Sequence, residues 1–174
     1  MFGIPPELLE VVATHLGAAG NPHPVQRVEP ARGGYSVAAK ARLVTRRGSY
    51  LLKWQAEHRP RLFTGEAYAL ERLREAGVIR VPAVLVAVDA TPDLPGYILE
   101  EWIGHASTEA HLRRVGSRLG GRIAELHRCG VAEGAQTPGY GLGHHGHYWG
   151  ETKPSTWDDW ATFYRERLAS TTGR

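Results

Sequence analysis

The sequence predicts an α+β fold, in which an antiparallel sheet with one helix is followed by a mostly helical segment. Apolar and polar residues alternate over residues 37–43, and residues 50–54, 81–88 and 96–103 are rich in residue types that favour strands. After residue 103, apolar residues recur at helical spacing instead. We therefore expect one domain over residues 1–103 and a second, helical domain over residues 104–174.

The first domain is expected to begin with a short amphipathic helix. Pro5 and Pro6 stand where a helix can start, apolar residues follow at helical spacing as far as Leu16, and Gly17 and Gly20 end the run. A polar turn at residues 46–48 then joins two strands. The region from about residue 28 to residue 55 is therefore predicted to be antiparallel hairpin structure.

A second helix is predicted between the two pairs of strands. Its apolar face runs from Phe63 to Ala76, and Gly77 is well placed to cap its C-terminus. The Pro-rich residues 92–95 favour a turn between the last two strands. The expected order is therefore strand, strand, helix, strand, strand.

The second domain is expected to open with a long helix over residues 112–126 that ends at Gly130. Residues 131–154 are rich in Gly, His and Pro and predict an irregular loop. Helical spacing of the aromatic residues that follow favours a core role over a ligand platform. Asp158 and Asp159 are adjacent on the same predicted helix and point in different directions, so we expect a capping role rather than a catalytic pair. The aromatic residues are Trp157, Trp160, Phe163 and Tyr164.

Composition narrows the class of protein. Of the 174 residues, 42% are hydrophobic, enough for one ordinary core or two small lobes, and a net charge of +3 provides no polybasic surface for nucleic acid. The only cysteine, Cys129, cannot form an intrachain disulfide, which favours a reducing, cytoplasmic location. No apolar run approaches the length of about 20 residues that spans a bilayer, so we expect no membrane partner.

Three features point together to a polyphosphate ligand: the Gly33-Gly34 turn, Lys53 in a strand, and Glu66 in the next helix. Backbone amides of a small-residue turn and an ammonium group can meet the charges of a nucleotide triphosphate. A lysine in an apolar strand needs a carboxylate to fix its head group, and Glu66 could supply it. Each feature alone has an ordinary explanation, namely a tight turn, an edge-strand lysine and a solvated carboxylate. Their order and spacing favour the nucleotide site.

These residues belong to a wider pattern that resembles the fructosamine kinases, or ketosamine-3-kinases, relatives of the aminoglycoside phosphotransferases within the protein-kinase-like fold. The resemblance covers nearly the whole chain, and its closing aromatic pattern is the most specific part. It is carried by Gly33-Gly34, Tyr50-Leu51-Leu52-Lys53-Trp54, Gly65-Glu66-Ala67, Val81-Pro82, Ile98-Leu99-Glu100-Glu101-Trp102, Leu119-Gly120-Gly121, Leu126-His127, Tyr140-Gly141-Leu142, Trp157-Asp158-Asp159-Trp160 and Phe163-Tyr164-Arg165-Glu166-Arg167-Leu168.

The resemblance implies a kinase-like ATP-binding N-lobe over residues 1–103 and ATP-dependent phosphorylation of a sugar hydroxyl on a ketosamine. It implies a catalytic pair of Lys53 with Glu66, with Lys53 also contacting the phosphates. Mg²⁺ is expected only in the full-length enzyme, and no metal site is expected in this chain. The other implied ATP-binding residues are Gly33, Gly34, Tyr35 and Ser36 over the phosphates and Glu100, Glu101 and Trp102 as a hinge that meets adenine, largely through backbone groups.

The sequence departs from the family pattern in two places. The His-Gly-Asp motif and the later Asp-Pro motif, which orient the acceptor hydroxyl and hold Mg²⁺, do not occur, and His145-Gly146-His147 is only an echo in the wrong place. We therefore expect an N-terminal portion of a kinase with an incomplete C-lobe over residues 104–174, which is inactive alone and could self-associate through its truncated face. The substrate-side loop also differs from the pattern, at Gly146, His147, Lys153 and Ser155.

Other interpretations remain open at this point. His144, His145 and His147, with His127 as a remote fourth ligand, could bind a metal, but a polar surface loop is favoured because no acidic partner accompanies them. A non-catalytic nucleotide-binding or interaction module is a second functional hypothesis. A relative of the aminoglycoside or choline kinases is a third, and it would leave the closing aromatic pattern unexplained.

Overall fold

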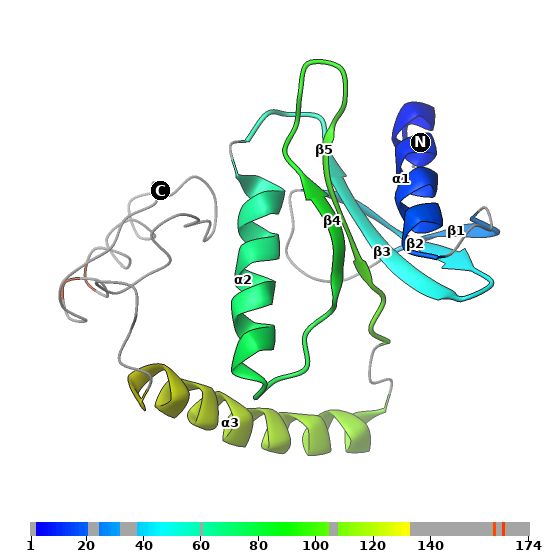
Figure 1. Ribbon diagram of the computed structural model, residues 1–174. Coiled ribbons are helices and arrows are strands. Elements are labelled where there is room, and N and C mark those ends of the chain that lie inside the picture. Colours follow the sequence, from blue (N-terminus) through cyan, green and yellow to red (C-terminus); the bar gives the residue numbers. More distant parts are fainter. Residues whose placement is uncertain are drawn as a thin grey trace. The chain divides into compact units, whose positions relative to one another are not determined.

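A five-stranded antiparallel sheet forms the centre of the first part of the chain (Figure 1). The computed structural model describes residues 3–20, 25–31, 38–59, 61–104 and 108–132, together with residues 162 and 165. The sheet order is β1-β2-β3-β5-β4. The elements, in chain order, are α1 (Pro6–Ala18), β1 (Arg27–Pro30), β2 (Ala39–Thr45), β3 (Gly48–Gln55), α2 (Leu62–Ala76), β4 (Val84–Val88), β5 (Gly96–Glu101) and α3 (Glu109–Ala132). The predicted α+β fold class is confirmed.

Short turns set the register of the sheet. The turn between β2 and β3 pairs Thr45 with Gly48, and the Thr45 hydroxyl donates to the Gly48 carbonyl oxygen at 3.0 Å. Between β4 and β5, the backbone amide of Thr91 donates to the Leu94 carbonyl oxygen at 2.9 Å. A Cβ atom on Gly96 would lie 2.7 Å from the Ala90 nitrogen, so only glycine fits the start of β5. Both predicted turns are present.

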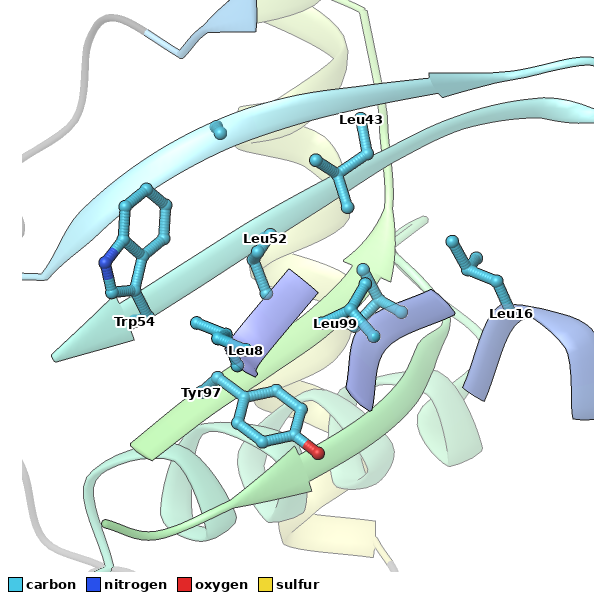
Figure 2. Close-up of a cluster of buried hydrophobic side chains, with 9 residues drawn as sticks. Leu8, Leu16, Leu43, Leu52, Trp54, Tyr97 and Leu99 are labelled. Atoms are coloured by element: carbon cyan, nitrogen blue, oxygen red, sulfur yellow. The ribbon is translucent and has the colours of Figure 1, made fainter. Parts of the chain in front are cut away.

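Helix α1 covers one face of the sheet and buries the larger hydrophobic cluster (Figure 2). Its residues Leu8, Val12 and Leu16, spaced by one helical turn, are almost fully buried. Every second residue of the central strands meets them, because side chains alternate between the two faces of a strand. The sheet residues in this cluster are Ala41, Leu43, Leu52, Trp54, Tyr97 and Leu99.

Helix α2 lies on the opposite face of the sheet (Figure 1). Phe63 is buried there against Ile98 of β5, and Ala67, Leu70, Val84 and Ala87 pack around them. The helix ends at Gly77, whose φ of 66° is the left-handed conformation that glycine adopts without strain. The cluster of buried residues on the α2 face has fewer members than the cluster on the α1 face, and the α2 face also carries charged side chains.

Several details differ from the sequence predictions. Residues 81–83 precede β4 rather than forming part of it, and β1 was not predicted as a separate strand. The prediction that Gly130 ends the long helix is wrong, because α3 continues to Ala132. Glycine lowers helix stability by roughly 1 kcal/mol but does not by itself terminate a helix. Residues 131 and 132, which were predicted to begin the loop, are the end of α3. The rest of the loop and the last helix lie outside the described residues, except for Thr162 and Arg165, which are helical.

The chain divides into two compact units. The first comprises Met1–Glu71 and Pro82–His105, and the second comprises Arg72–Val81 and Ala106–Arg174. Within the second unit, α3 exposes four large apolar side chains at helical spacing: Leu112, Val115, Leu119 and Ile123. In the described part of the chain, no helix is both long enough and apolar enough to cross a membrane.

Candidate functional site

Lys53 lies in the middle of β3 on the face of the sheet that α2 covers. Its chain neighbours Leu52 and Trp54 point into the cluster under α1, so strand alternation turns Lys53 to the other side. There it stands opposite Ile98 of β5, which packs against Phe63 of α2. The same alternation that builds the core therefore turns Lys53 toward the α2 side of the sheet.

Two carboxylates hold the Lys53 ammonium group. Its Nζ lies 2.6 Å from Oε1 of Glu66, on the second turn of α2, and 2.8 Å from Oε1 of Glu100, on β5. The Lys53 and Glu100 side chains are 17% and 3% exposed, whereas that of Glu66 is 36% exposed. The pairing of Lys53 with Glu66 that the sequence suggested is present, and Glu100 is an additional partner.

Burial and ion pairing shift the pKa values of Lys53 and Glu100 in opposite directions. Burial on its own would lower the pKa of Lys53, but the charges and hydrogen bonds of Glu66 and Glu100 outweigh it, so the pKa is raised. Burial raises the pKa of Glu100, and the nearby Glu66 charge adds to this, while the attraction of Lys53 offsets only part of it. Lys53 is therefore held in its charged form at neutral pH.

Lys53 faces two carboxylates, so one ammonium group is shared between two acidic side chains. The second carboxylate oxygen of Glu100, Oε2, is buried and has no hydrogen-bond partner in the described structure. An ammonium group has three N–H donors, and two of those on Lys53 are directed at the carboxylates. The third is directed at neither of these two carboxylates.

Asp89, which follows β4, fixes the start of α2. One carboxylate oxygen accepts hydrogen bonds from the backbone amides of Phe63 and Thr64, at 3.1 and 3.4 Å. The other accepts the Thr64 hydroxyl at 2.7 Å. These amides belong to the first turn of the helix, where backbone donors lack intrahelical partners. The cap ties α2 to the sheet and so places Glu66 over Lys53.

Replacing Asp89 with alanine is expected to lower the free energy of unfolding by about 1–2 kcal/mol, the usual effect of losing a helix cap. Urea unfolding followed by circular dichroism measures the change. Asp93→Ala, in the exposed turn between β4 and β5, is the matched control and should change stability by less than about 0.5 kcal/mol. Equal effects of the two substitutions would contradict the capping role.

The segment predicted as a hinge, residues 100–102, forms the end of β5 and the residue after it. The backbone amide of Glu101 donates to the Ala83 carbonyl oxygen at 2.8 Å, and that of Trp102 donates to the Ser49 carbonyl oxygen at 3.1 Å. Neither amide is available to a nucleotide base without breaking a bond of the sheet. The guanidinium of Arg42 lies 5.1 Å from the centroid of the Trp102 ring, in the range of a cation–π contact.

Several predicted residues lie outside the described part of the chain. They include the turn expected to cover the phosphates, Gly33, Gly34, Tyr35 and Ser36, and the histidines at positions 144, 145 and 147. Among the residues that the structure does describe, no group of three or more His, Cys, Asp or Glu side chains is placed to hold a metal ion.

Sequence reasoning missed two side chains that build this site. Glu100 was assigned to the hinge through its backbone, although its side chain pairs with Lys53, and Asp89 was not singled out. Strand alternation could have placed Glu100 on the same face as Ile98. The register that sets Ile98 opposite Lys53 depends on turns and packing, which the residue pattern alone does not provide.

Comparison with known proteins gives the family. The family model described as fructosamine kinase matches residues 9–171, most of the chain. The chain belongs to the fructosamine kinase family. Its resemblance to that family, noted from the sequence motifs, is confirmed.

Two relatives show how much of a family member the chain represents. The chloroplastic protein-ribulosamine 3-kinase of Arabidopsis thaliana is 29% identical over 136 residues, which are 78% of this chain and 39% of the plant protein. A crystal structure from Haemophilus somnus 129PT, assigned as a fructosamine-3-kinase, has a TM-score of 0.63 at 18% identity and covers 95% of this chain and 54% of that one. The match therefore spans about two fifths of the plant protein and about half of the Haemophilus somnus protein. The structural likeness supports the kinase-like fold.

Proposed function

We propose that this chain carries the nucleotide-binding part of a kinase that transfers the γ-phosphoryl group of ATP to a sugar hydroxyl of a ketosamine. The observation that carries the proposal is the Lys53 ammonium, buried under α2 and held by Glu66 and Glu100. In phosphoryl transfer of this type, a strand lysine paired with a helix glutamate positions the phosphates. Family membership and the names of the relatives support ketosamines as the substrate class.

In this proposal, Lys53 contacts the phosphates and Glu66 is a positioning residue that acts through Lys53. Gly33, Gly34, Tyr35 and Ser36 cover the phosphates, and the segment of Glu100, Glu101 and Trp102 lies beside the adenine. Because the amides of Glu101 and Trp102 are already bonded within the protein, adenine would contact other backbone groups of this segment. We place the boundary between the two lobes after residue 103.

Magnesium would neutralise charge on the phosphates in such a reaction. Among the described residues, no group of three or more His, Cys, Asp or Glu side chains is placed to hold a metal ion. The 174 residues also contain no His-Gly-Asp motif to orient the acceptor hydroxyl. We therefore expect these residues alone to bind ATP without transferring phosphate, and we propose a cytoplasmic location on the basis of the single cysteine.

The test is titration of the chain with ATP in the presence of Mg²⁺, followed by calorimetry, together with an assay of phosphate transfer to a small fructosamine. We expect measurable binding and no transfer. Absence of ATP binding by the folded chain would refute the nucleotide-binding role, and transfer would refute the expectation of inactivity.

Glu66→Ala is expected to weaken ATP binding by about three- to fivefold, less than any substitution that removes the ammonium group itself. Loss of a half-exposed ion-pair partner typically costs no more than about 1 kcal/mol. The same calorimetric titration measures the change. A loss as large as that caused by removing Lys53 would contradict an indirect role.

A non-catalytic interaction module is the second candidate function. It is favoured by the exposed apolar stripe on α3, formed by Leu112, Val115, Leu119 and Ile123. Self-association through this stripe would appear in sedimentation velocity as a concentration-dependent increase in mass. Leu119→Glu should reduce it, and an unchanged monomer at all concentrations would exclude it.

A further inference from the structure

We propose that Glu100 is a second positioning residue for Lys53, which holds the ammonium group on the sheet independently of helix α2. The inference deepens the proposed function and rests on it for the part that concerns ATP. In this proposal, two elements hold the Lys53 ammonium group: strand β5 through the buried Glu100, and helix α2 through the more exposed Glu66.

The two partners of Lys53 stand on elements of different kinds. Glu100 is on β5, which lies between β3 and β4, so backbone hydrogen bonds fix its strand on both sides. Its side chain is 3% exposed and has little space to reorient. Glu66 is on a helix joined to the sheet through its capped N-terminus and apolar side chains, and its side chain is 36% exposed.

Strand register keeps Glu100 beside Lys53 without any contribution from α2. Lys53 stands opposite Ile98, and Glu100 is two residues further along β5, on the same face and opposite Leu51. A diagonal of this kind separates backbone positions by about 7–8 Å, which the long Lys and Glu side chains bridge. The distance of 2.8 Å between Lys53 Nζ and Glu100 Oε1 shows that they do.

The charged groups around Glu100 can be named element by element. Lys53 faces it from β3, Glu66 faces Lys53 from α2, and on β2 the residues Lys40 and Arg42 share this face of the sheet. The β4 residue paired with Glu100 is Val84, which carries no charge. Lys53 is thus the cation that Glu100 contacts directly. Burying such a pair is costly, because the loss of hydration of both charges can exceed their attraction.

If Glu66 and Glu100 can each hold Lys53 alone, the ATP affinities of their variants should follow a specific pattern. With Lys53 still held by the remaining carboxylate, Glu66→Ala and Glu100→Met should each weaken binding by less than about fivefold. The double variant should lose about tenfold more than the product of the two single losses, within the range of couplings between contacting residues. Removing carboxylates also lowers the repulsion of phosphate, but that effect tightens binding and cannot imitate the expected loss.

Glu100→Gln is the conservative rescue, because the amide oxygen can still accept a hydrogen bond from Lys53. In the Glu66→Ala background it should recover part of the affinity that Glu100→Met loses. Circular dichroism and thermal unfolding of all variants exclude misfolding as the cause. Single effects that simply multiply in the double variant would overturn the proposal.

A second measurement does not involve nucleotide. The chain has three lysines, at positions 40, 53 and 153, so acylation by an N-hydroxysuccinimide ester can be followed at Lys53 by peptide mass spectrometry, with Lys40 as the internal reference. Ion pairing keeps Lys53 protonated and unreactive. Glu66→Ala should raise its rate by less than about threefold, and the double variant by more than about tenfold.

The two measurements separate the two proposals. If the chain fails to bind ATP but Lys53 becomes reactive only in the double variant, the nucleotide role fails and the role of Glu100 stands. If Glu66→Ala alone makes Lys53 as reactive as the double variant does, Glu100 does not hold the lysine and this inference is overturned.

A positioning role and a purely structural role also differ in how Glu100→Gln should change stability at neutral pH. Since the folded protein raises the pKa of Glu100, it binds more protons than the unfolded chain above pH 4.5, and stability falls as pH rises through the folded pKa. Glu100→Gln removes this loss, so the variant should be at least as stable as the natural chain at neutral pH. In the Glu66→Ala background, the same substitution should still leave ATP bound less tightly than by Glu66→Ala alone. A structural role would lower stability and affinity together.

Discussion

Replacing Lys53 with methionine should lower the affinity for ATP by about 10- to 100-fold. The side chain keeps its apolar stem, but the charge that meets the phosphates is removed, and a hydrogen bond to a charged group contributes about 1.5–3 kcal/mol. Calorimetric titration with ATP and Mg²⁺ measures the loss.

Stability must be separated from binding in this experiment. Lys53→Met leaves Glu100 buried without a counter-charge, which destabilises a protein by several kcal/mol unless the carboxyl takes up a proton. The companion variant Lys53→Met with Glu100→Gln removes that charge, so it should unfold at a higher temperature than Lys53→Met while remaining equally weak in ATP binding.

Arg113→Met is the control for loss of a positive charge at a distance. Arg113 is exposed on α3, where it pairs only with Glu109 of the same helix among the contacts described, and its replacement should change ATP affinity by less than about twofold. If the companion variant bound ATP as tightly as the natural chain, Lys53 would have no part in the nucleotide site.

The sequence was sufficient for most of the fold in the first unit because its signals are local. Helix α1 follows from apolar residues at helical spacing between Pro6 and Gly17, and the β2–β3 hairpin from two short strands around a polar turn. Strand β1 was less visible because it has only four residues, one of them Pro30, and three of the four are exposed. Its position depends on pairing with β2, a contact between distant residues.

The site was predictable only in part for the same physical reason. Glu66 follows Lys53 at a spacing that strand and helix geometry can bring together, so the pair could be proposed from the chain alone. Glu100 is 47 positions along the chain from Lys53, which it contacts. Asp89 is 25 positions from Thr64, whose hydroxyl it accepts. Such contacts depend on register, and the residue pattern does not specify the register between β3 and β5.

Leu52→Ala should lower the free energy of unfolding by about 2–5 kcal/mol, the range found when a buried leucine is truncated. Leu52 is fully buried in the cluster under α1, and the cavity would lie among the side chains shown in Figure 2. The matched control, Leu112→Ala, removes a side chain that is 55% exposed on α3 and should change stability far less. Urea unfolding measures both; a comparable loss from Leu112→Ala would show that the α3 stripe is covered.

The same variant tests whether the two faces of the sheet have separate roles. Leu52 and Lys53 are neighbours in β3 but point to opposite faces, so truncating Leu52 removes packing under α1 without removing either carboxylate from the ammonium group. At a temperature where the variant is folded, its ATP affinity should stay within about threefold of the natural chain. A much larger loss would mean that the position of Lys53 depends on the α1 core as well as on its two ion pairs, because strain in a close-packed interior is transmitted along the strand.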